Sequence, residues 1–189
     1  MRRTYFIRCF NLTVNLLKLS ILMLVVTAFN FALRFLIGKL LVVIHVPILL
    51  LVYTNGAYQY AILVTVTMAC LEAGLIMGEL IIRMKTDSVL NVVRATIRTE
   101  HLRQFLKQAN KEQSLVTISF NKAVGKSVVD VRKDRLLVRI PIPRQQQAQK
   151  QLLDMQNQIV NDVSNSNPNF IFSNAQRSGK WLWIIGTRQ

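Results

Sequence analysis

Residues 57–82 read AYQYAILVTVTMACLEAGLIMGELII, which is long enough to cross a bilayer as one helix, because a span takes about 20 mainly apolar residues. A second stretch, residues 16–37, also qualifies if Lys18 and Arg34 reach toward the two membrane interfaces. Two such stretches predict a membrane protein.

The apolar segment between these stretches, residues 40–53, is short for a span and contains His45 and Pro47. It is ambiguous between a short span, a re-entrant segment and an interfacial segment. We expect residues 1–82 to form a membrane-anchor region with two transmembrane helices, and three helices are the alternative.

The charge of the chain is distributed unevenly. The net charge of +15 divides into +6 for residues 1–39, −2 for residues 40–82 and +11 for residues 83–189. Cytoplasmic flanks of membrane spans collect Lys and Arg, which here are Arg2, Arg3, Arg8 and Lys18 before the first span and Arg83, Lys85, Arg94 and Arg98 after the last. We therefore expect both termini in the cytoplasm, which requires an even number of crossings.

The basic N-terminus followed by an apolar run from Leu19 also fits a signal peptide. That run continues to Leu33 without a convincing small-x-small cleavage site, so we expect an uncleaved anchor. The two cysteines, Cys9 and Cys70, are too few for a disulfide framework and do not indicate an oxidising compartment.

Two carboxylates and two glycines in the last span are candidates for helix packing in the membrane. Glu72 and Glu79 are one heptad apart and share a helix face, where an ionisable group should meet a neighbouring helix or a water-filled cavity. Gly74 and Gly78 form a GxxxG pattern, which we expect on an adjoining face and which permits close helix approach. The alternative is that Glu72 only pairs with a polar neighbour, such as His45 or Asn30.

After the last span, residues 83–112 predict a basic helix that leaves the membrane, with Val89, Val93 and Ile97 at roughly helical spacing. Its cations are candidates for contact with anionic lipid or nucleic acid: Arg83, Lys85, Arg94, Arg98, Arg103 and Lys107. No nucleic-acid-binding motif is present, so we expect such binding to be weak and sensitive to salt.

Residues 113–189 predict a small cytoplasmic α+β domain of order βββαββ. The expected strands are 114–120, 127–132 and 135–142, a helix covers 145–163, and a hairpin follows from Phe170 to Ile185. A core of this size is near the lower limit for independent stability, so a partner or self-association is expected.

The tripeptide Gly125-Lys126-Ser127 matches the end of a phosphate-binding P-loop, but Phe120 stands where the first glycine belongs. The residues after Ser127 predict a strand rather than the helix that a P-loop needs, so we interpret Gly125 as part of a hairpin turn. Trp181 and Trp183 alternate on one strand face, where core packing is the ordinary role and stacking on nucleic-acid bases the alternative.

No cluster with metal-ligand spacing or pattern of a hydrolase is present in the sequence, since its two histidines, His45 and His101, stand apart from cysteines and carboxylate clusters. We therefore expect no enzyme activity, no cofactor and no metal.

The order of elements resembles a known family. A pair of spans, the basic helix Val92-Val-Arg-Ala-Thr-Ile-Arg-Thr-Glu-His-Leu-Arg-Gln-Phe-Leu and the ending Ser178-Gly-Lys-Trp-Leu-Trp are similar to the N-terminal membrane-anchor region of conjugative coupling proteins of the FtsK/TcpA type from Gram-positive bacteria. In that family an ATPase motor with a P-loop follows, and this sequence has no Walker motifs. The resemblance implies a bacterial cell-membrane protein without the motor.

These observations favour a non-enzymatic assembly or anchoring component, in a conjugative DNA-transfer (type IV secretion-like) apparatus if the resemblance holds. We expect a homo-oligomer or association with other membrane subunits. One alternative is a membrane anchor that binds nucleic acid or anionic lipid through its basic domain. Another is a small transporter or channel accessory that uses Glu72.

Overall fold

The computed structural model describes residues 4–44, 48–107 and 114–189, which form two compact units. The helical unit comprises residues 11–79. The α+β unit comprises residues 80–189 together with the described N-terminal residues 4–10.

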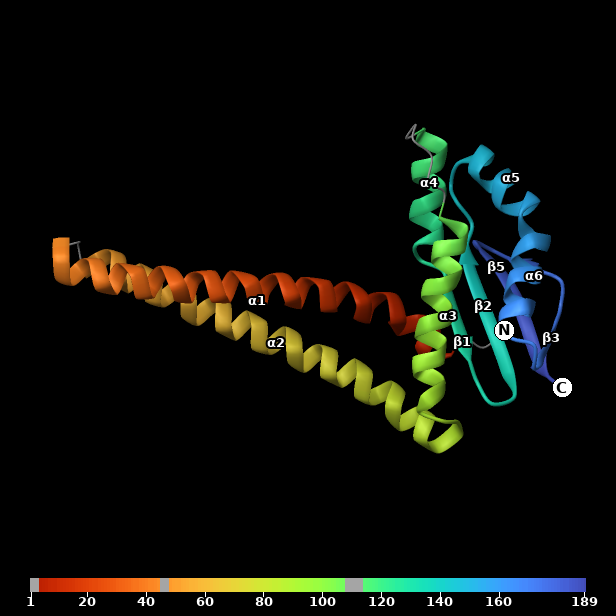
Figure 1. The fold of residues 1–189 in the computed structure, drawn as a ribbon, viewed down its shortest axis with the longest axis horizontal. Helices are drawn as coiled ribbons and strands as arrows, with labels where there is room; N and C mark the ends of the chain where they lie inside the picture. The colour runs from red at the N-terminus through yellow and green to blue at the C-terminus, as the bar shows by residue number, and fades with distance from the viewer. Residues whose placement is uncertain (1–3, 45–47, 108–113) are drawn as a thin grey trace. The chain divides into compact units, whose positions relative to one another are not determined.

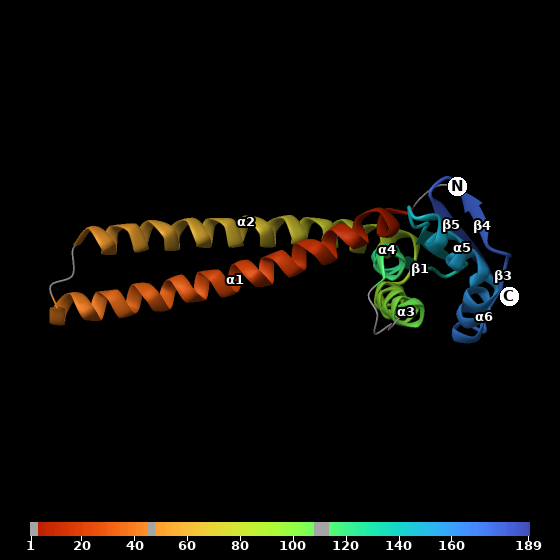
Figure 2. The ribbon, with the colours of Figure 1, turned by 90° about the horizontal axis from the view of Figure 1, so that it is seen from above.

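Two long apolar helices make up the helical unit: α1 (Tyr5–Ile44) and α2 (Ile48–Thr86), which run side by side in Figures 1 and 2. Both are long and apolar enough to cross a membrane. At about 1.5 Å per residue, each is roughly 60 Å long, twice the hydrocarbon thickness of a bilayer. The two predicted apolar helices are therefore confirmed, and each continues well beyond the predicted span.

The ambiguous segment 40–53 does not form a separate helix in the part that the structure describes. Residues 40–44 are the end of α1 and residues 48–53 are the beginning of α2. His45 and Pro47 lie outside the described residues. Two long helices, rather than three, are what the described residues contain.

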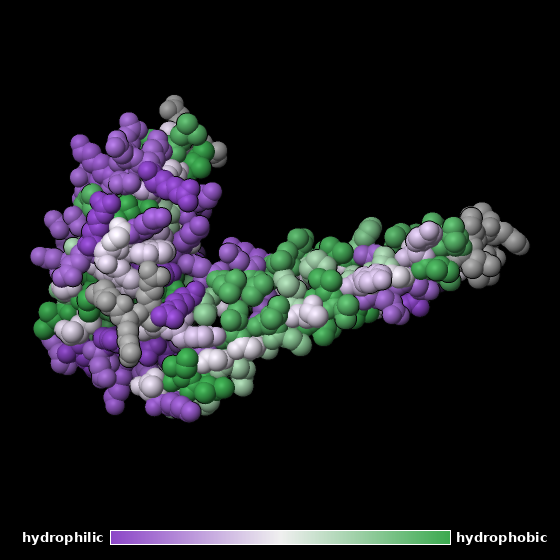
Figure 3. Space-filling model, turned by 180° about the vertical axis from the view of Figure 1, so that it is seen from behind, coloured by the Kyte–Doolittle hydropathy of each residue, from purple (hydrophilic) through white to green (hydrophobic). Residues whose placement is uncertain are grey.

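The two long helices touch through both polar and aromatic side chains. The ring centres of Phe31 in α1 and Tyr58 in α2 are 5.9 Å apart. The hydroxyl oxygens of Thr27 and Thr65 are 3.0 Å apart, and each is 2.8 Å from a carbonyl oxygen of its own helix, on Met23 and Ala61. Elsewhere along the helices, apolar side chains cover most of the surface, as the green surface in Figure 3 shows. Such a surface is suited to lipid.

The α+β unit contains one antiparallel sheet of order β1-β2-β5-β3. The strands are β1 (Val128–Val131), β2 (Arg135–Pro141), β3 (Phe170–Phe172), β4 (Gln176–Ser178) and β5 (Trp181–Arg188), with β4 pairing the first part of β5. The predicted strands 127–132 and 135–142 are confirmed. β2 pairs with β5 along its whole length, and the core lies on this central pair.

Four helices complete the α+β unit: α3 (Leu90–Leu106), α4 (Leu115–Val124), α5 (Gln146–Asp154) and α6 (Gln156–Ser166). The predicted basic helix is confirmed as α3, and the predicted helix 145–163 is confirmed with an interruption at Met155. Figure 1 shows α3 beside β1, and α4 packs against both α3 and α5.

The predicted strand 114–120 is wrong, because this segment belongs to α4. Ser114 caps the helix by accepting a hydrogen bond from the Thr117 amide at 3.2 Å. The buried residues of α4 are Thr117, Phe120 and Val124, which follow a helical spacing of three and four residues. Packing of this face on the sheet outweighs the β-propensity of the segment, so the order of elements after α3 is αββααβββ rather than βββαββ.

Gly125 ends α4 instead of turning a hairpin, and its amide donates to the Asn121 carbonyl at 2.9 Å. The chain passes from a helix through Gly125-Lys126-Ser127 into β1, whereas a P-loop passes from a strand into a helix.

The first described residues of the chain belong to the core of the α+β unit. Phe6 and Ile7 are buried there, and the Ile7 amide donates to the Thr4 hydroxyl at 3.4 Å. The α+β unit is thus built from two separate pieces of chain.

Candidate functional site: a basic groove beginning at the end of α2

A groove of about 590 Å³ lies in the α+β unit where three segments meet. The end of α2 and the first turns of α3 form one wall, the turn between β1 and β2 forms another, and the ends of β3 and β5 complete it. Its charged lining residues are Asp87, Arg94, Arg132, Lys133 and Arg188, and its amide side chains are those of Asn91 and Asn169.

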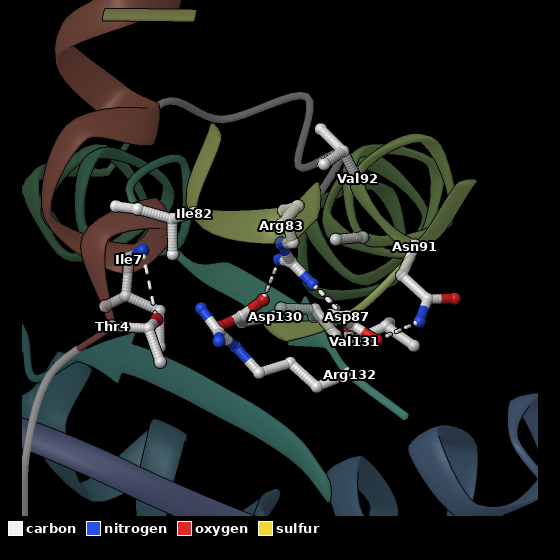
Figure 4. A network of polar contacts seen from close by, with 12 residues as sticks. Thr4, Ile7, Ile82, Arg83, Asp87, Asn91, Val92, Asp130, Val131 and Arg132 are labelled. Atoms are coloured by element: carbon white, nitrogen blue, oxygen red, sulfur yellow. Dashed lines mark hydrogen bonds and ion pairs between the residues drawn. The ribbon is translucent and has the colours of Figure 1, made fainter. Parts of the chain in front are cut away.

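Arg83, in the last turn of α2, organises the floor beside this groove (Figure 4). Its side chain is fully buried. One guanidinium nitrogen donates to Asp87 Oδ2 and to the Val131 carbonyl, both at 2.6 Å, and the other donates to the Asp130 carboxylate. Its Cζ atom also lies 5.5 Å from the centre of the Phe6 ring.

Asp87 is held in its charged form. Burial alone would raise its pKa, but hydrogen bonds from the Ser88 backbone, the Arg83 and Asn91 side chains and the Lys133 amide together lower the pKa below its ordinary value. The Asn91 amide group is 2.8 Å from Asp87 Oδ1, and the Lys133 backbone nitrogen is 3.0 Å from the same oxygen. These bonds tie the α2–α3 corner to the β1–β2 turn.

The groove has a net positive charge because the carboxylates in and beside it form ion pairs with the buried Arg83. Asp87 and Asp130 both pair with Arg83, and Asp130 also accepts from Arg132 Nε at 3.2 Å. Counting Arg83 with the four cations that line the groove, positive charges exceed these two negative ones by three. The site is therefore suited to an anion with several oxygens, such as a phosphate group.

The structure disperses the six cations that were predicted as one contact surface. Arg94 lines the groove, Lys85 and Lys107 are exposed elsewhere, and Arg98 is half-buried. Arg83 does not belong to such a surface, because its guanidinium is buried against two carboxylates.

Arg103 is also partly withdrawn from the surface. Its Nε donates to the Ser127 carbonyl at 3.0 Å, and its Cζ lies 5.3 Å from the centre of the Phe10 ring. Burial lowers the pKa of this guanidinium, partly opposed by the charge of Glu100. The side chain fastens α3 to β1 and to the start of α1.

Sequence patterns gave no indication of Arg132, Lys133 and Arg188 as groove residues. Arg132 and Lys133 follow β1, and Arg188 ends β5, so the sheet pairing alone brings them together. The Arg188 guanidinium is 3.4 Å from the Lys133 carbonyl.

The tryptophans of β5 have different surroundings. Trp183 is buried in the core, whereas Trp181 is half-buried with the Arg139 guanidinium 4.2 Å from its ring centre. Trp183 therefore packs in the core, which is the ordinary role expected from the sequence.

The candidate packing residues in α2 lie on two different faces. Glu72 and Glu79 are buried, at 8% and 6% exposure, and Glu72 Oε1 has no hydrogen-bond partner among the described residues. Gly74 is exposed, and a Cβ atom added there would meet nothing within 4 Å. Two residues along a helix are about 200° apart, so this glycine face is opposite to Glu72 rather than adjoining it. Gly78 is half-buried.

Comparison with protein-family models, with curated proteins and with solved structures finds no match to this chain. The resemblance to conjugative coupling proteins therefore stays a prediction. The groove and the two long helices are the features from which a function can be inferred.

Proposed function

We propose that this protein is a non-enzymatic, membrane-anchored assembly component that holds a phosphate-bearing partner at the cytoplasmic surface of the membrane. The observation that carries this proposal is the basic groove, which begins at Thr86, the last residue of the apolar helix α2. A ligand in the groove would be tied by chain connectivity to a membrane anchor. The resemblance described above would place such a component in a DNA-transfer apparatus.

The two-piece construction of the α+β unit supports this topology. Residues 4–10 and residues 80–87 belong to the same compact unit, while the apolar residues between them belong to another. If the helical unit crosses the membrane, both of its ends therefore return to one side. The excess of Lys and Arg in the α+β unit favours the cytoplasmic side.

The groove supplies the chemistry that phosphate recognition needs. Arg94 and Arg188 offer planar guanidinium groups that can bind two oxygens at once, and Lys133 offers a compact charge. Arg83 neutralises the nearby carboxylates and so prevents them from repelling an anion.

Removing two charges from the groove should weaken this binding. Because a Lys or Arg near an anionic surface contributes about 1 kcal/mol, we expect Lys133→Gln with Arg188→Gln to lower affinity roughly 10- to 30-fold. The measurement uses the full chain in neutral detergent micelles, titrated with fluorescent phosphatidylglycerol and, separately, with a labelled DNA duplex at low salt.

Arg177→Gln with Lys180→Gln is the matched control, since it removes the same charge from exposed residues outside the groove. Affinities that fall equally in the two double variants would mean that only the net charge matters, and the groove would lose its role.

Assembly through the membrane is a second part of the proposal, supported by the open face at Gly74. A GxxxG pattern lets helix backbones approach closely, and the described residues leave the space around Gly74 empty. This face is therefore available to another subunit, whereas Glu72 is buried.

We expect Gly74→Ile to weaken self-association in detergent at least about tenfold, because an isoleucine side chain keeps the helix backbones apart. The mass of the protein–detergent complex, measured by light scattering over a dilution series, gives the association constant. Ala69→Ile is the control, because Ala69 is an exposed alanine on another side of the same helix. A wild-type protein that is monomeric throughout would contradict assembly by α2.

A further inference from the structure

We infer that the first two turns of α3 lie in the interface of an anionic phospholipid bilayer, which names the partner of the α+β unit and rests on the membrane anchorage proposed above. The contact surface is an apolar stripe of four residues. They are exposed although they are aliphatic: Val89 (42%), Leu90 (66%), Val93 (55%) and Ile97 (61%).

The stripe does not serve the core of the α+β unit. The face of α3 that packs on the sheet carries the buried residues Asn91, Ala95, Thr99, Leu102 and Leu106. At 100° per residue, Leu90, Val93 and Ile97 fall within about 60° of one another, on the side opposite to that face. The first half of α3 therefore has an exposed apolar face in addition to the face that packs on the sheet.

The position of the stripe along the chain favours lipid as its occupant. Three residues, Asp87, Ser88 and Val89, separate the end of α2 from the start of α3. Even a fully extended connection would keep Leu90 within about 14 Å of Thr86. An apolar surface so close to the end of a membrane helix is within reach of the interface.

The stripe is confined to the half of α3 that is nearest to α2. In the second half, the exposed positions are Glu100, His101, Gln104 and Phe105. Phe105 is 41% exposed, but at 100° per residue it is about 90° around the helix from the centre of the stripe. A surface for a second copy or for another protein would have no reason to fade with distance from the membrane helix, whereas a helix that leaves a bilayer would show this gradient.

The charges beside the stripe specify an anionic surface. Arg94 and Arg98 are the next exposed or half-buried cations on the same helix, and Lys85 precedes it. Arg94 also opens onto the basic groove, so a headgroup phosphate in the groove and acyl chains against the stripe would belong to the same lipid layer. Basic residues beside an aliphatic face are the pattern of interfacial helices, and a nucleic acid would gain little from Leu90, Val93 and Ile97.

The test measures depth in the membrane by fluorescence quenching. The full chain is placed in nanodiscs of phosphatidylcholine with about one-third phosphatidylglycerol. Some lipids carry a nitroxide, near the headgroup end of the acyl chain in the samples labelled at positions 93, 97 and 161, and near the terminal methyl group in the sample labelled at Cys70. In a Cys9→Ser, Cys70→Ser background, an environment-sensitive fluorophore is attached to Val93→Cys, Ile97→Cys or Asn161→Cys. Asn161 is an exposed residue of α6 and serves as the distant control. A Cys9→Ser variant labelled at the exposed Cys70 reports whether α2 is inserted.

We expect quenching at positions 93 and 97 to be at least about threefold stronger than at position 161. Replacing phosphatidylglycerol by phosphatidylcholine should reduce it about twofold at positions 93 and 97 and leave it unchanged at Cys70. Unfolding midpoints in urea equal to wild type show that the labelled variants are folded.

Strong quenching at Cys70 with no more quenching at positions 93 and 97 than at position 161 would overturn the inference and leave the membrane anchorage intact. Absence of quenching at Cys70 would overturn the anchorage, and this inference with it. Shielding of positions 93 and 97 that requires a second copy in the nanodisc, or added DNA duplex, would assign the stripe to that occupant and also overturn the inference.

Discussion

Arg83→Leu should lower the free energy of unfolding of the α+β unit by about 3–5 kcal/mol, because it removes the cation that pairs with Asp87 and leaves Asp130 with Arg132 alone. The Asp130 and Asp87 side chains are almost fully buried, and both pair with Arg83. The variant also removes the bond to the Val131 carbonyl and so releases the end of α2 from β1. Urea unfolding of the full chain in detergent, followed by tryptophan fluorescence, measures the change because Trp183 is in the core.

Two further variants separate the charge from the packing. Adding Asp130→Asn to Arg83→Leu should recover part of the loss, since it removes a buried charge whose remaining cation is Arg132. Arg144→Leu changes an exposed arginine after β2 and should alter stability by no more than about 0.5 kcal/mol. Equal stability of Arg83→Leu and Arg144→Leu would refute the role assigned to the buried network.

Phe120→Ala should cost about 3–5 kcal/mol, as expected for truncating a fully buried aromatic side chain. Phe120 has no exposed surface and lies on the face of α4 that joins the core. The same urea experiment measures the loss, and far-ultraviolet circular dichroism shows whether α4 persists.

Ile118→Ala is the matched control in the same helix, because Ile118 is 47% exposed and removes a similar apolar group from the surface. If the segment were the strand predicted from its composition, residues 118 and 120 would share one face and both substitutions would be costly. Similar large losses at both positions would therefore contradict the helical assignment.

The sequence pattern predicted those elements whose signal is strong within one segment. The alternation of Leu136, Val138 and Ile140 predicts β2 from its own residues. The strand can therefore be recognised without knowing that it pairs with β5. The two apolar helices were evident for the same reason. Their ends were not, because the helices continue into the α+β unit, where α2 ends in the Arg83 network.

The segment Leu115–Phe120 shows where local reasoning fails. Val116, Thr117 and Ile118 are β-branched and favour a strand, but the Ser114 cap and the packing of Phe120 and Val124 make a helix. Short segments of this kind are decided by tertiary packing, which no window of sequence contains.

The candidate site was harder to predict than the fold. Arg83 and Asp130 are 47 residues apart in the sequence, and the groove adds Arg188 from the last strand. In a basic segment of sequence, nothing distinguishes an arginine that will be buried from one that will be exposed. The sequence therefore predicts Arg83 in the same contact surface as Lys85 and Arg94. Only the sheet pairing distinguishes them.

The burial of Phe6 and Ile7 has a consequence for biogenesis. These residues belong to the first turn of α1 and leave the ribosome before the rest of the two long helices, yet the sheet on which they pack is completed by β5, near residue 188. Contacts that span most of a chain form slowly, because a large loop must close first. The α+β unit can therefore reach its final core only after the intervening helical hairpin has been made. Under the membrane anchorage proposed above, folding of the α+β unit would then report that the hairpin has been inserted.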